Sequence, residues 1–277
     1  MEPEAALLKN KVAIITGGGG GIGRGISLAF AAHGARIVVA EKDATRASET
    51  VAEIKKLNAQ AVASVVDVRE KDQVSEMAKA AFSEFGQVDI LVNNVGDYMR
   101  ERKSFIDTTE EDWETLYRIN LKHVFLCTRA IAPKMIERSA GGSIINVSTV
   151  EAFRAIPGQV VYSAFKGAIT QFTKSFAMEV AQHRIRVNAI APDMIQSIQL
   201  NLDQMIPPEQ HHLIPVWMPL GRFGIPDDIA GVAVFLASDL SSFITGTTLH
   251  ADGGTYAAGG WYRSIERDRW TNMPLNP

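Results

Sequence analysis

The chain is poor in cysteine and in long apolar segments. Its 277 residues include a single cysteine, Cys127, so no disulfide can form within the chain. The longest apolar stretches, such as Ile229–Ala237, are too short to span a bilayer, and Met1–Asn10 has two glutamates and no apolar run of signal-peptide length. These absences predict a protein of the reducing cytoplasm without a membrane anchor.

An excess of positive charge is also missing. The sequence has 28 Lys and Arg against 31 Asp and Glu, a formal net charge of −3, and its basic residues form no run. A site for the phosphates of nucleic acid or for an anionic membrane surface needs clustered basic residues. The composition therefore argues against both partners and favours a small-molecule partner.

The remaining composition is that of an ordinary globular protein. Hydrophobic residues make up 46% of the chain and charged residues 21%, which is enough apolar material to bury a full core. No linker rich in Pro, Ser or Gly and no block of like charge divides the sequence. We therefore expect one domain over residues 1–277.

Short β-branched apolar segments alternate with segments of helical period along the chain. Apolar strands separated by helices predict a parallel sheet covered by helices on both faces, with a ligand at the carboxyl ends of the strands. The fold class is thus α/β, doubly wound. The expected strands are Val12–Thr16, Arg36–Glu41, Ala61–Asp67, Ile90–Val92, Ser143–Val147 and Ile185–Ile190, and the expected helices are Ile22–His33, Ala44–Leu57, Glu70–Phe85, Asp112–Arg138 and Val161–His183.

A glycine-rich segment, Thr16-Gly17-Gly18-Gly19-Gly20-Gly21-Ile22-Gly23, joins the first expected strand to the first expected helix. Glycines permit positive φ and let backbone N–H groups approach a pyrophosphate, which the helix N-terminus then stabilises. The run also satisfies G-x-G-x-x-G at Gly18, Gly20 and Gly23, so its register stays open. A merely flexible loop would not need the flanking strand and helix. The segment therefore predicts a dinucleotide site of Rossmann type.

An acidic residue, Glu41, ends the second expected strand. A carboxylate at this position can accept hydrogen bonds from the adenosine ribose hydroxyls of NAD, whereas it would repel the 2′-phosphate of NADP. The glycine turn has no basic residue, although Lys42 lies next to the acid. NAD is therefore favoured over NADP. The alternative is that Glu41 is a solvated residue at a strand end.

A tyrosine and a lysine stand four residues apart in Tyr162-Ser163-Ala164-Phe165-Lys166, hence on one face of an expected helix. A free phenol titrates near 10, so a tyrosine that acts as acid and base near neutrality needs a positive charge beside it. Lys166 can supply that charge. On periodicity alone, a packed ring and a solvated amine would be the more ordinary explanation, and the nearby dinucleotide turn favours the catalytic one.

Taken together, these motifs resemble those of the short-chain dehydrogenase/reductase family, from Lys11 to about Gly254. The matching segments are Thr16–Gly23 for T-G-x-x-x-G-x-G, Asp67 for the adenine-contacting Asp, Asn93-Asn94-Val95-Gly96 for N-N-A-G, Asn120 for the helix asparagine, Tyr162–Lys166 for Y-x-x-x-K and Asp252-Gly253-Gly254 for the late D-G-G.

The resemblance implies roles for individual residues. Tyr162 would be the catalytic acid/base, Lys166 would bind the nicotinamide ribose and lower the pKa of the tyrosine, and Asn120 would anchor a water of a proton relay. The implied contacts with NAD are Gly17, Gly21, Ile22, Gly23, Glu41, Asp67, Val68, Asn94, Gly96, Tyr162, Lys166, Pro192 and Ile195. The family also implies a homo-oligomer, a tetramer or a dimer.

The sequence departs from the family at the hydroxyl that polarises the substrate. That residue is usually a serine thirteen positions before the tyrosine, and here the position holds Thr149. Threonine keeps the hydroxyl, but its methyl group stiffens χ1 and narrows the pocket. We assign the role to Thr149, with Ser148 as the alternative. Ser148 could also merely satisfy backbone at the strand end.

The loop after the sixth strand departs as well. The family's P-G is Pro192-Asp193 here, and its downstream threonine is Ser197. This loop borders the nicotinamide in the family, so a carboxylate at Asp193 could change the conformation of the loop or the polar groups that the site accepts. Asp97, after Gly96, is equally unexpected. Both aspartates could instead be solvated or cap a helix.

Two further segments bear on specificity. Residues 193–220 are rich in Met, Ile, Leu and Pro, in the place where the family has a mobile substrate lid; an apolar lid favours an apolar or cyclic substrate, and plain packing is the alternative. Residues 255–277 form a C-terminal extension in which aromatic residues alternate with arginines, which favours subunit contact or closure of the pocket. The aromatic residues are Tyr256, Trp261, Tyr262 and Trp270, and the arginines are Arg263, Arg267 and Arg269.

No metal site is expected. His211 and His212 are consecutive, so their side chains do not converge on one ion, and no Cys, His or Glu with ligand spacing surrounds them. Cys127 is expected to be an inert buried thiol.

The leading interpretation is an NAD-linked dehydrogenase of a secondary alcohol. A carbonyl reductase that uses NADPH is the second, since the reaction is reversible. A dinucleotide-binding regulatory protein with little activity is the third, because of Thr149 and Asp193, and the intact Tyr162, Lys166 and Asn120 argue against it.

Overall fold

The computed structural model describes residues 8–99, 103–198, 200–264 and 269–271. Within them, a seven-stranded sheet has the order β3-β2-β1-β4-β5-β6-β7, and each neighbouring pair is parallel. This confirms the doubly wound α/β fold. The strands are β1 (Val12–Thr16), β2 (Arg36–Glu41), β3 (Ala61–Val65), β4 (Ile90–Asn93), β5 (Gly142–Val147), β6 (Ile185–Pro192) and β7 (Thr248–Ala251).

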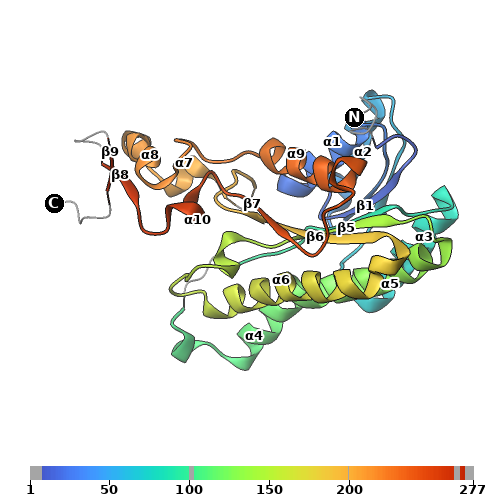
Figure 1. Ribbon diagram of the computed structural model, residues 1–277, viewed down its shortest axis with the longest axis horizontal. Coiled ribbons are helices and arrows are strands. Elements are labelled where there is room, and N and C mark those ends of the chain that lie inside the picture. Colours follow the sequence, from blue (N-terminus) through green and yellow to red (C-terminus); the bar gives the residue numbers. More distant parts are fainter. Residues whose placement is uncertain (1–7, 100–102, 199, 265–268, 272–277) are drawn as a thin grey trace.

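Helices cover both faces of the sheet (Figure 1). On one face lie α1 (Gly21–Ala32), α2 (Ala44–Lys56) and α9 (Pro226–Ala237), and on the other lie α3 (Lys71–Phe85), α5 (His123–Arg138) and α6 (Val160–Val180). Each layer has its own apolar core against the sheet, with Phe30 fully buried in the first and Ile131 in the second. The two-sided burial explains why the strands are near-continuous apolar runs.

The strand order places the ligand site. The chain winds from β1 outward to β3 and then returns to the other side of β1 at β4. In such a sheet the helices after β1 and β4 diverge, which opens a crevice at the carboxyl ends of the strands. Glu41, Gly17 and Asn94 directly end or follow β2, β1 and β4, and so they lie side by side at this crevice.

The expected helix Asp112–Arg138 is wrong as a single element. The structure has α4 (Glu110–Tyr117), a π-helical turn (Arg118–Lys122) and then α5. A capping box starts α4 two residues earlier than expected, since Thr109 Oγ1 accepts from Asp112 N at 3.2 Å and Asp112 Oδ2 accepts from Thr109 N at 2.9 Å. Periodicity could not reveal the π turn, because apolar spacing shifts there by a single residue.

Two elements of the seven-stranded sheet and its covering helices, β7 and α9, were not expected from the sequence. The edge strand β7 is short and only half-buried, and its sequence Thr-Leu-His-Ala has a weak strand pattern. Helix α9 was noted only as an apolar stretch, and a proline at its first position marks its start. Among the described residues, no helix combines the length and apolar character needed to cross a membrane.

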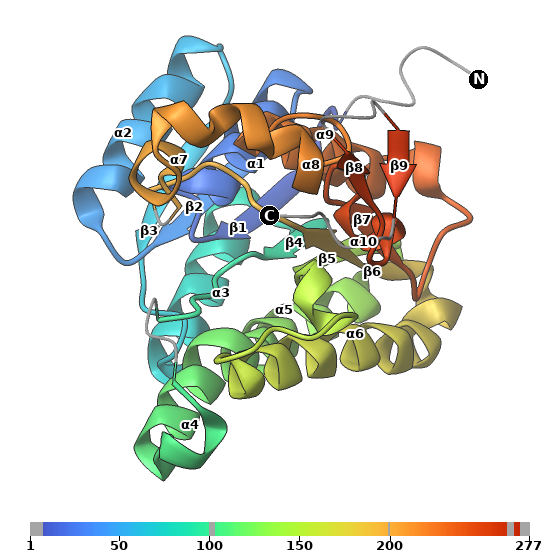
Figure 2. The same cartoon turned by 90° about the vertical axis from the view of Figure 1, so that its left-hand side faces the viewer.

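Residues 193–220 and the C-terminal extension form short elements at one end of the molecule. Figure 2 shows α8 beside β8, and contacts join these two elements. The hairpin of β8 and β9 is antiparallel. Arg267 lies outside the described residues, as do the rest of 265–268 and 272–277. The short elements of these two segments are α7 (Leu202–Met205), a 3₁₀ turn (Pro208–Leu213), α8 (Ile214–Trp217), α10 (Thr255–Ala258), β8 (Tyr262–Ser264) and β9 (Arg269–Thr271). Elsewhere in the chain, 3₁₀ turns lie at Phe105–Asp107, Val150–Ala152, Ala181–His183 and Asp239–Ser241.

Candidate active site

A cleft of about 390 Å³ crosses the carboxyl ends of the strands, from β2 to β6. Its volume falls within the range of small-molecule sites, roughly 300–1,000 Å³. Most predicted site residues line it, namely Gly17, Gly21, Ile22, Glu41, Asp67, Val68, Asn94, Gly96, Ser148, Thr149, Tyr162, Lys166, Pro192 and Ile195. The two other predicted site residues, Gly23 and Asn120, do not line the cleft.

The glycine turn lines the cleft at Gly17, Gly20 and Gly21. Gly17 and Gly21 have positive φ, +64° and +48°, and Gly21 is the first residue of α1. A Cβ at Gly23 would lie 2.2 Å from the carbonyl oxygen of Gly17, so this glycine permits close packing of helix against turn. The turn therefore follows the register of Gly17, Gly21 and Gly23, with the N-terminus of α1 directed at the place of a pyrophosphate.

Three hydrogen bonds fix the start of the glycine turn to the end of β4. Thr16 Oγ1 donates to Val92 O at 3.2 Å and accepts from Asn94 N at 2.9 Å, and Asn94 Nδ2 donates to Thr16 O at 3.0 Å. All three residues are at the ends of adjacent parallel strands. Asn94 thus fixes the end of β4 to the end of β1, next to the cleft that Asn94 and Gly17 both line.

Glu41 is buried at the end of β2, where it lines the cleft. Its Oε1 accepts from Arg46 Nη2 at 3.0 Å and from Asp43 N at 3.2 Å. Arg46 also lines the cleft, and sequence reasoning missed it; its place in the first turn of α2, just after Glu41, was the available signal. A Cβ at Gly19 would lie 2.8 Å from Glu41 Cγ and 3.0 Å from Arg46, so only glycine fits above this ion pair.

Asp67 lies at the same end and is held by Arg69. The Arg69 guanidinium donates to both carboxylate oxygens, from Nε at 2.9 and 3.0 Å. Hydrogen bonding to Arg69 lowers the pKa of Asp67 below its usual value, against the opposing effect of burial. Asp67 therefore stays charged beside a cation.

These features fit a nicotinamide dinucleotide. The turn offers a cradle that side chains would fill, a helix N-terminus for phosphates and an acid for ribose hydroxyls. Glu41 and Asp67 would hold the adenosine, the turn the pyrophosphate, and Lys166 the second ribose. The reactive end would then lie near Tyr162, Pro192 and Ile195.

Lys166 is buried one helical turn after Tyr162 on α6. Its Nζ donates to Val147 O at 3.1 Å and lies 5.9 Å from the centroid of the Tyr162 ring. A Cβ at Gly96 would lie 2.6 Å from Nζ, so this glycine makes room for the ammonium group. Burial lowers the pKa of Lys166 to about 8, and the nearby Asp97 opposes this shift.

The phenol of Tyr162 is held in its protonated form. Burial raises its pKa above the usual value, the charges of Glu151 and Asp97 and the ring of Tyr98 act in the same direction, and hydrogen bonding with Thr149 acts against them. Desolvation disfavours the phenolate more than this contact favours it. The expectation that Lys166 lowers the pKa of the phenol stays a prediction, since the net shift in the protein alone is upward and burial is its largest cause.

The two candidate hydroxyls have different surroundings. Ser148 Oγ donates to the backbone oxygen of Lys166 at 3.0 Å, so it ties β5 to α6. Thr149 Oγ1 instead lies beside the phenol of Tyr162 and donates to Pro192 O at 3.3 Å. Thr149 therefore remains our candidate for the polarising hydroxyl.

Thr149→Ala is expected to reduce turnover by roughly ten- to a thousandfold, as loss of a donor to a developing oxyanion does. Ser148→Ala should reduce it far less, because the Ser148 hydroxyl ties β5 to α6, whereas the Thr149 hydroxyl lies beside the phenol of Tyr162. Steady-state kinetics of both variants, with NAD affinity as a control, check this. If Ser148→Ala proves the more damaging, the alignment of thirteen residues is wrong and Ser148 is the polarising group.

Asn120 is buried in the π-helical turn. Its Nδ2 donates to Asp97 O at 2.8 Å and to Leu116 O at 3.1 Å, and its Oδ1 accepts from Asp97 N at 3.1 Å. π turns recur at functional sites because they redirect one side chain or carbonyl. Asn120 thus fixes the loop after β4, and its role in a proton relay stays a prediction.

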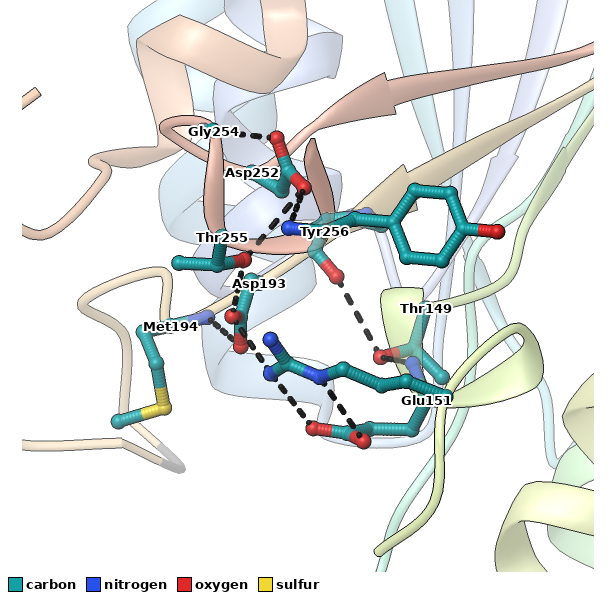
Figure 3. A network of polar contacts seen from close by, with 10 residues as sticks. Thr149, Glu151, Asp193, Met194, Asp252, Gly254, Thr255 and Tyr256 are labelled. Carbon is teal, nitrogen blue, oxygen red and sulfur yellow. Dashed lines mark hydrogen bonds and ion pairs between the residues drawn. The ribbon is translucent and has the colours of Figure 1, made fainter. Parts of the chain in front are cut away.

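Asp193 is neither solvated nor a helix cap. It is buried at the end of β6, with Arg154 Nη2 2.7 Å from its Oδ2 (Figure 3). Arg154 and Glu151, which lines the cleft, come from the loop after β5 and were missed, since nothing in the sequence pairs them with Asp193. Asp97 likewise accepts from Met99 N at 2.7 Å, which is a local turn contact.

Some residues of 193–220 line the cleft and others pack among themselves, and a role as a substrate lid stays a prediction. Met194, Ile198 and Met205 line the cleft, whereas Ile214 and Met218 pack into a small cluster of their own. His211 and His212 in this segment contact backbone oxygens, at 3.1 and 2.7 Å. Within the described part of the chain, no group of three or more His, Cys, Asp or Glu could hold a metal.

Cys127 is fully buried in α5, and burial raises the pKa of its thiol to about 12. The thiol therefore stays protonated and unreactive.

Comparison with known proteins gives consistent matches. The sequence model of a family described as Enoyl-(Acyl carrier protein) reductase matches residues 17–256. The 3-oxoacyl-[acyl-carrier-protein] reductase FabG of Thermotoga maritima is 36% identical over 247 residues, which cover 89% of this chain and 98% of that protein. The galactitol 2-dehydrogenase of Agrobacterium fabrum is 38% identical over 257 residues, 90% of this chain and 98% of its own.

A solved structure agrees in fold. A 7α-hydroxysteroid dehydrogenase complexed with NADH and 7-oxo glycochenodeoxycholic acid has a TM-score of 0.85 and 34% identity, over 92% of this chain and 97% of that chain. These proteins are dehydrogenases and reductases of different substrates. They agree on the reaction type and leave the substrate open.

Proposed function

Because the chain belongs to the short-chain dehydrogenase/reductase family, whose members are NAD(P)-dependent oxidoreductases, we propose that it oxidises a secondary alcohol with NAD as cofactor. The observation that carries the proposal is the meeting of Tyr162, Lys166 and Thr149 at one end of a cleft whose other end is lined by Glu41.

In this proposal each side chain has one task. Thr149 turns its single O–H from Pro192 O to the substrate oxygen, and Tyr162 takes the hydroxyl proton and returns it in the reverse reaction. Lys166, which is buried and four residues along α6, holds the ribose and adds positive charge beside the phenol. The bound cofactor supplies the hydride chemistry, and the protein supplies orientation and electrostatics. Because the phenol alone is held protonated, positive charge in the cleft is needed before it can act as a base.

The buried carboxylate of Glu41 supports NAD over NADP. It lies where two ribose hydroxyls can donate to it, and a phosphate dianion there would meet a like charge. One observation favours the NADPH-linked reductase as a second candidate. Lys42, Arg46 and Arg69 all line the same end of the cleft and could surround a phosphate.

Glu41→Ala is expected to narrow the preference for NAD, mainly by improving NADP. The loss of a charge-assisted hydrogen bond costs ~1.5–3 kcal/mol, so NAD should also bind about one to two powers of ten more weakly. Dissociation constants of both cofactors for the wild type and the variant check this. Glu53→Ala is the control, because Glu53 pairs with Arg24 and does not line the cleft.

The opposite result has a clear meaning. If the wild type binds NADP as well as NAD, or if Glu41→Ala leaves the ratio unchanged, Glu41 does not select the cofactor and the NADPH-linked reductase is the better proposal.

The substrate proposed is a secondary alcohol with an apolar or cyclic body. Its support is the set of apolar side chains that line the same cleft as Tyr162, which includes Ile156, Met194 and Met205. The test is NADH formation with a panel of sterols, cyclic alcohols, sugar alcohols and hydroxy acids. Preference for sterols or cyclic alcohols supports the proposal, and preference for hydroxy acids or sugar alcohols rejects it.

The homo-oligomer, the single domain and the cytoplasmic location stay predictions. Exposed apolar side chains on the outer helices, such as Phe125 of α5 and Met178 of α6, are compatible with a subunit contact.

A further inference from the structure

Two departures from the family pattern, Thr149 and Asp193, lie side by side in the structure (Figure 3). The hydroxyl of Thr149 is held between two backbone groups. Its Oγ1 donates to Pro192 O at 3.3 Å and accepts from Glu151 N at 3.4 Å. The first group ends β6, and the second begins the loop after β5.

One guanidinium ties these two backbone segments together. Arg154 Nη2 lies 2.9 Å from Glu151 Oε1 and 2.7 Å from Asp193 Oδ2, and Arg154 Nε lies 3.3 Å from Glu151 Oε2. Glu151 carries the backbone N–H that donates to Thr149, and Asp193 directly follows Pro192, whose backbone oxygen accepts from Thr149. The ion pairs of Arg154 with Glu151 and Asp193 therefore connect the two backbone segments that hold the Thr149 hydroxyl.

Asp193 is anchored on its other side too. Its carboxylate accepts from Thr255 Oγ1 at 2.6 Å and from Met194 N at 2.9 Å, and its side chain is only 5% exposed. Asp252 holds Thr255 and Tyr256 in turn, so the end of β7 joins the same network (Figure 3). Met194, the next residue, has φ +27°, a conformation that side chains rarely adopt. The hydrogen bond from Met194 N to Asp193 Oδ1 stabilises this backbone.

This network of ion pairs and hydrogen bonds matters because the threonine side chain is stiff. Two heavy atoms on Cβ restrict χ1, so the place of Oγ1 follows the backbone and its neighbours closely. A serine could rotate to compensate for a shifted backbone.

We propose that Asp193 and Arg154 are positioning residues, which hold the Thr149 hydroxyl beside Tyr162 and thereby set the rate of the acid/base step. The inference rests on the proposed function of that site. It means that Thr149 and Asp193 act together, because the aspartate holds the backbone that positions the threonine hydroxyl.

The test is Asp193→Asn, which keeps the shape of the side chain and removes its charge. Turnover should fall by roughly tenfold or more, since a misplacement of about 1 Å can cost on the order of a hundredfold. NAD affinity should stay unchanged. The matched control is Asp89→Asn: Asp89 also pairs with an arginine, Arg138, at 2.7 Å, with side-chain exposures of 7% and 26% against 5% and 28% for Asp193 and Arg154. Asp89 lies at the opposite end of the strands, so its variant should lose stability and keep turnover.

A double-mutant cycle with Thr149→Ser separates positioning from a general structural role. In the Ser background, Asp193→Asn should cost less turnover, by a factor of roughly three or more, as coupled neighbours show. Equal losses in both backgrounds would overturn the proposal.

The pH profile gives a second readout by its sign. Loss of a negative charge near the site would by itself lower the pKa of Tyr162, whereas loss of the Thr149 contact would raise it. We expect the pKa seen in the rate of alcohol oxidation to rise in Asp193→Asn, because the loss of the Thr149 contact should outweigh the loss of the charge. A fall, or no change, contradicts the proposal.

Crystal structures of the wild type and Asp193→Asn separate this inference from the proposed function, because they need no substrate. Displacement of Thr149 Oγ1 from Pro192 O in the variant supports positioning even if no alcohol is oxidised. An unmoved Thr149 rejects positioning even if the enzyme proves to be an NAD-linked dehydrogenase.

Discussion

Tyr162→Phe is expected to lower turnover by about 10²–10⁴-fold, the usual contribution of a positioned acid/base. The change removes one oxygen from the catalytic end of the cleft and leaves the ring in place. The edge-to-face contact of the ring with Tyr98, at 6.4 Å between centroids, and the approach of Lys166 should survive. The measurement is turnover with the best alcohol of the panel, together with the dissociation constant of NAD.

The dissociation constant of NAD should barely change in this variant, because no contact predicted for the adenosine or the pyrophosphate involves the phenol oxygen. Tyr98→Phe is the matched control, since it removes a hydroxyl from the neighbouring ring and leaves Tyr162 intact. A Tyr162→Phe enzyme that keeps more than about a tenth of the wild-type rate would show that another group transfers the proton.

Lys166→Met is expected to lose both turnover and cofactor affinity. Methionine has a similar length and fills the buried space, so a cavity does not explain the loss. The ammonium donates to Val147 O and is the one group of the Tyr-Lys pair predicted to reach the ribose. Turnover and the dissociation constant of NAD are measured side by side, with the exposed Lys134→Met as control. Unchanged NAD affinity would reject the ribose contact.

The same variant has a predicted signature in stability. The pKa of Lys166 is about 8 in the fold against 10.5 for an unperturbed lysine, so between these values the native state binds fewer protons than the unfolded state. The free energy of unfolding should therefore rise with pH in this window as far as Lys166 contributes. Lys166→Met should remove that rise, which denaturant titrations at pH values on either side of the window can measure. An identical pH slope in both proteins would mean that the burial of Lys166 costs no stability.

Local patterns predicted the parts of the site that depend on local sequence. The alternation of strands and helices predicted six strands in the right places, and the Tyr162–Lys166 spacing predicted two side chains on one helix face. These features succeed because one turn or one strand end decides them. The positions of Gly17, Glu41 and Thr149 follow from strand ends that parallel pairing brings to one edge.

Contacts between distant segments were out of reach. Arg154 meets Asp193 only because β5 and β6 are neighbours in the sheet, and the two residues are far apart in the chain. Arg46 belongs to a helix whose first turn happens to point back over Glu41. The direction of the pKa shift of Tyr162 was missed for the same reason, since the burial of the phenol depends on the whole cleft.

Direct transfer of hydrogen from the alcohol to the cofactor tests the central claim most directly. The wild-type enzyme is incubated with NAD and a panel alcohol that carries deuterium on its carbinol carbon, and the NADH formed is examined by NMR. Our account predicts deuterium on the nicotinamide ring of the product NADH and almost no NADH from the Tyr162→Phe enzyme. NADH without deuterium, or equal NADH from both proteins, would contradict it.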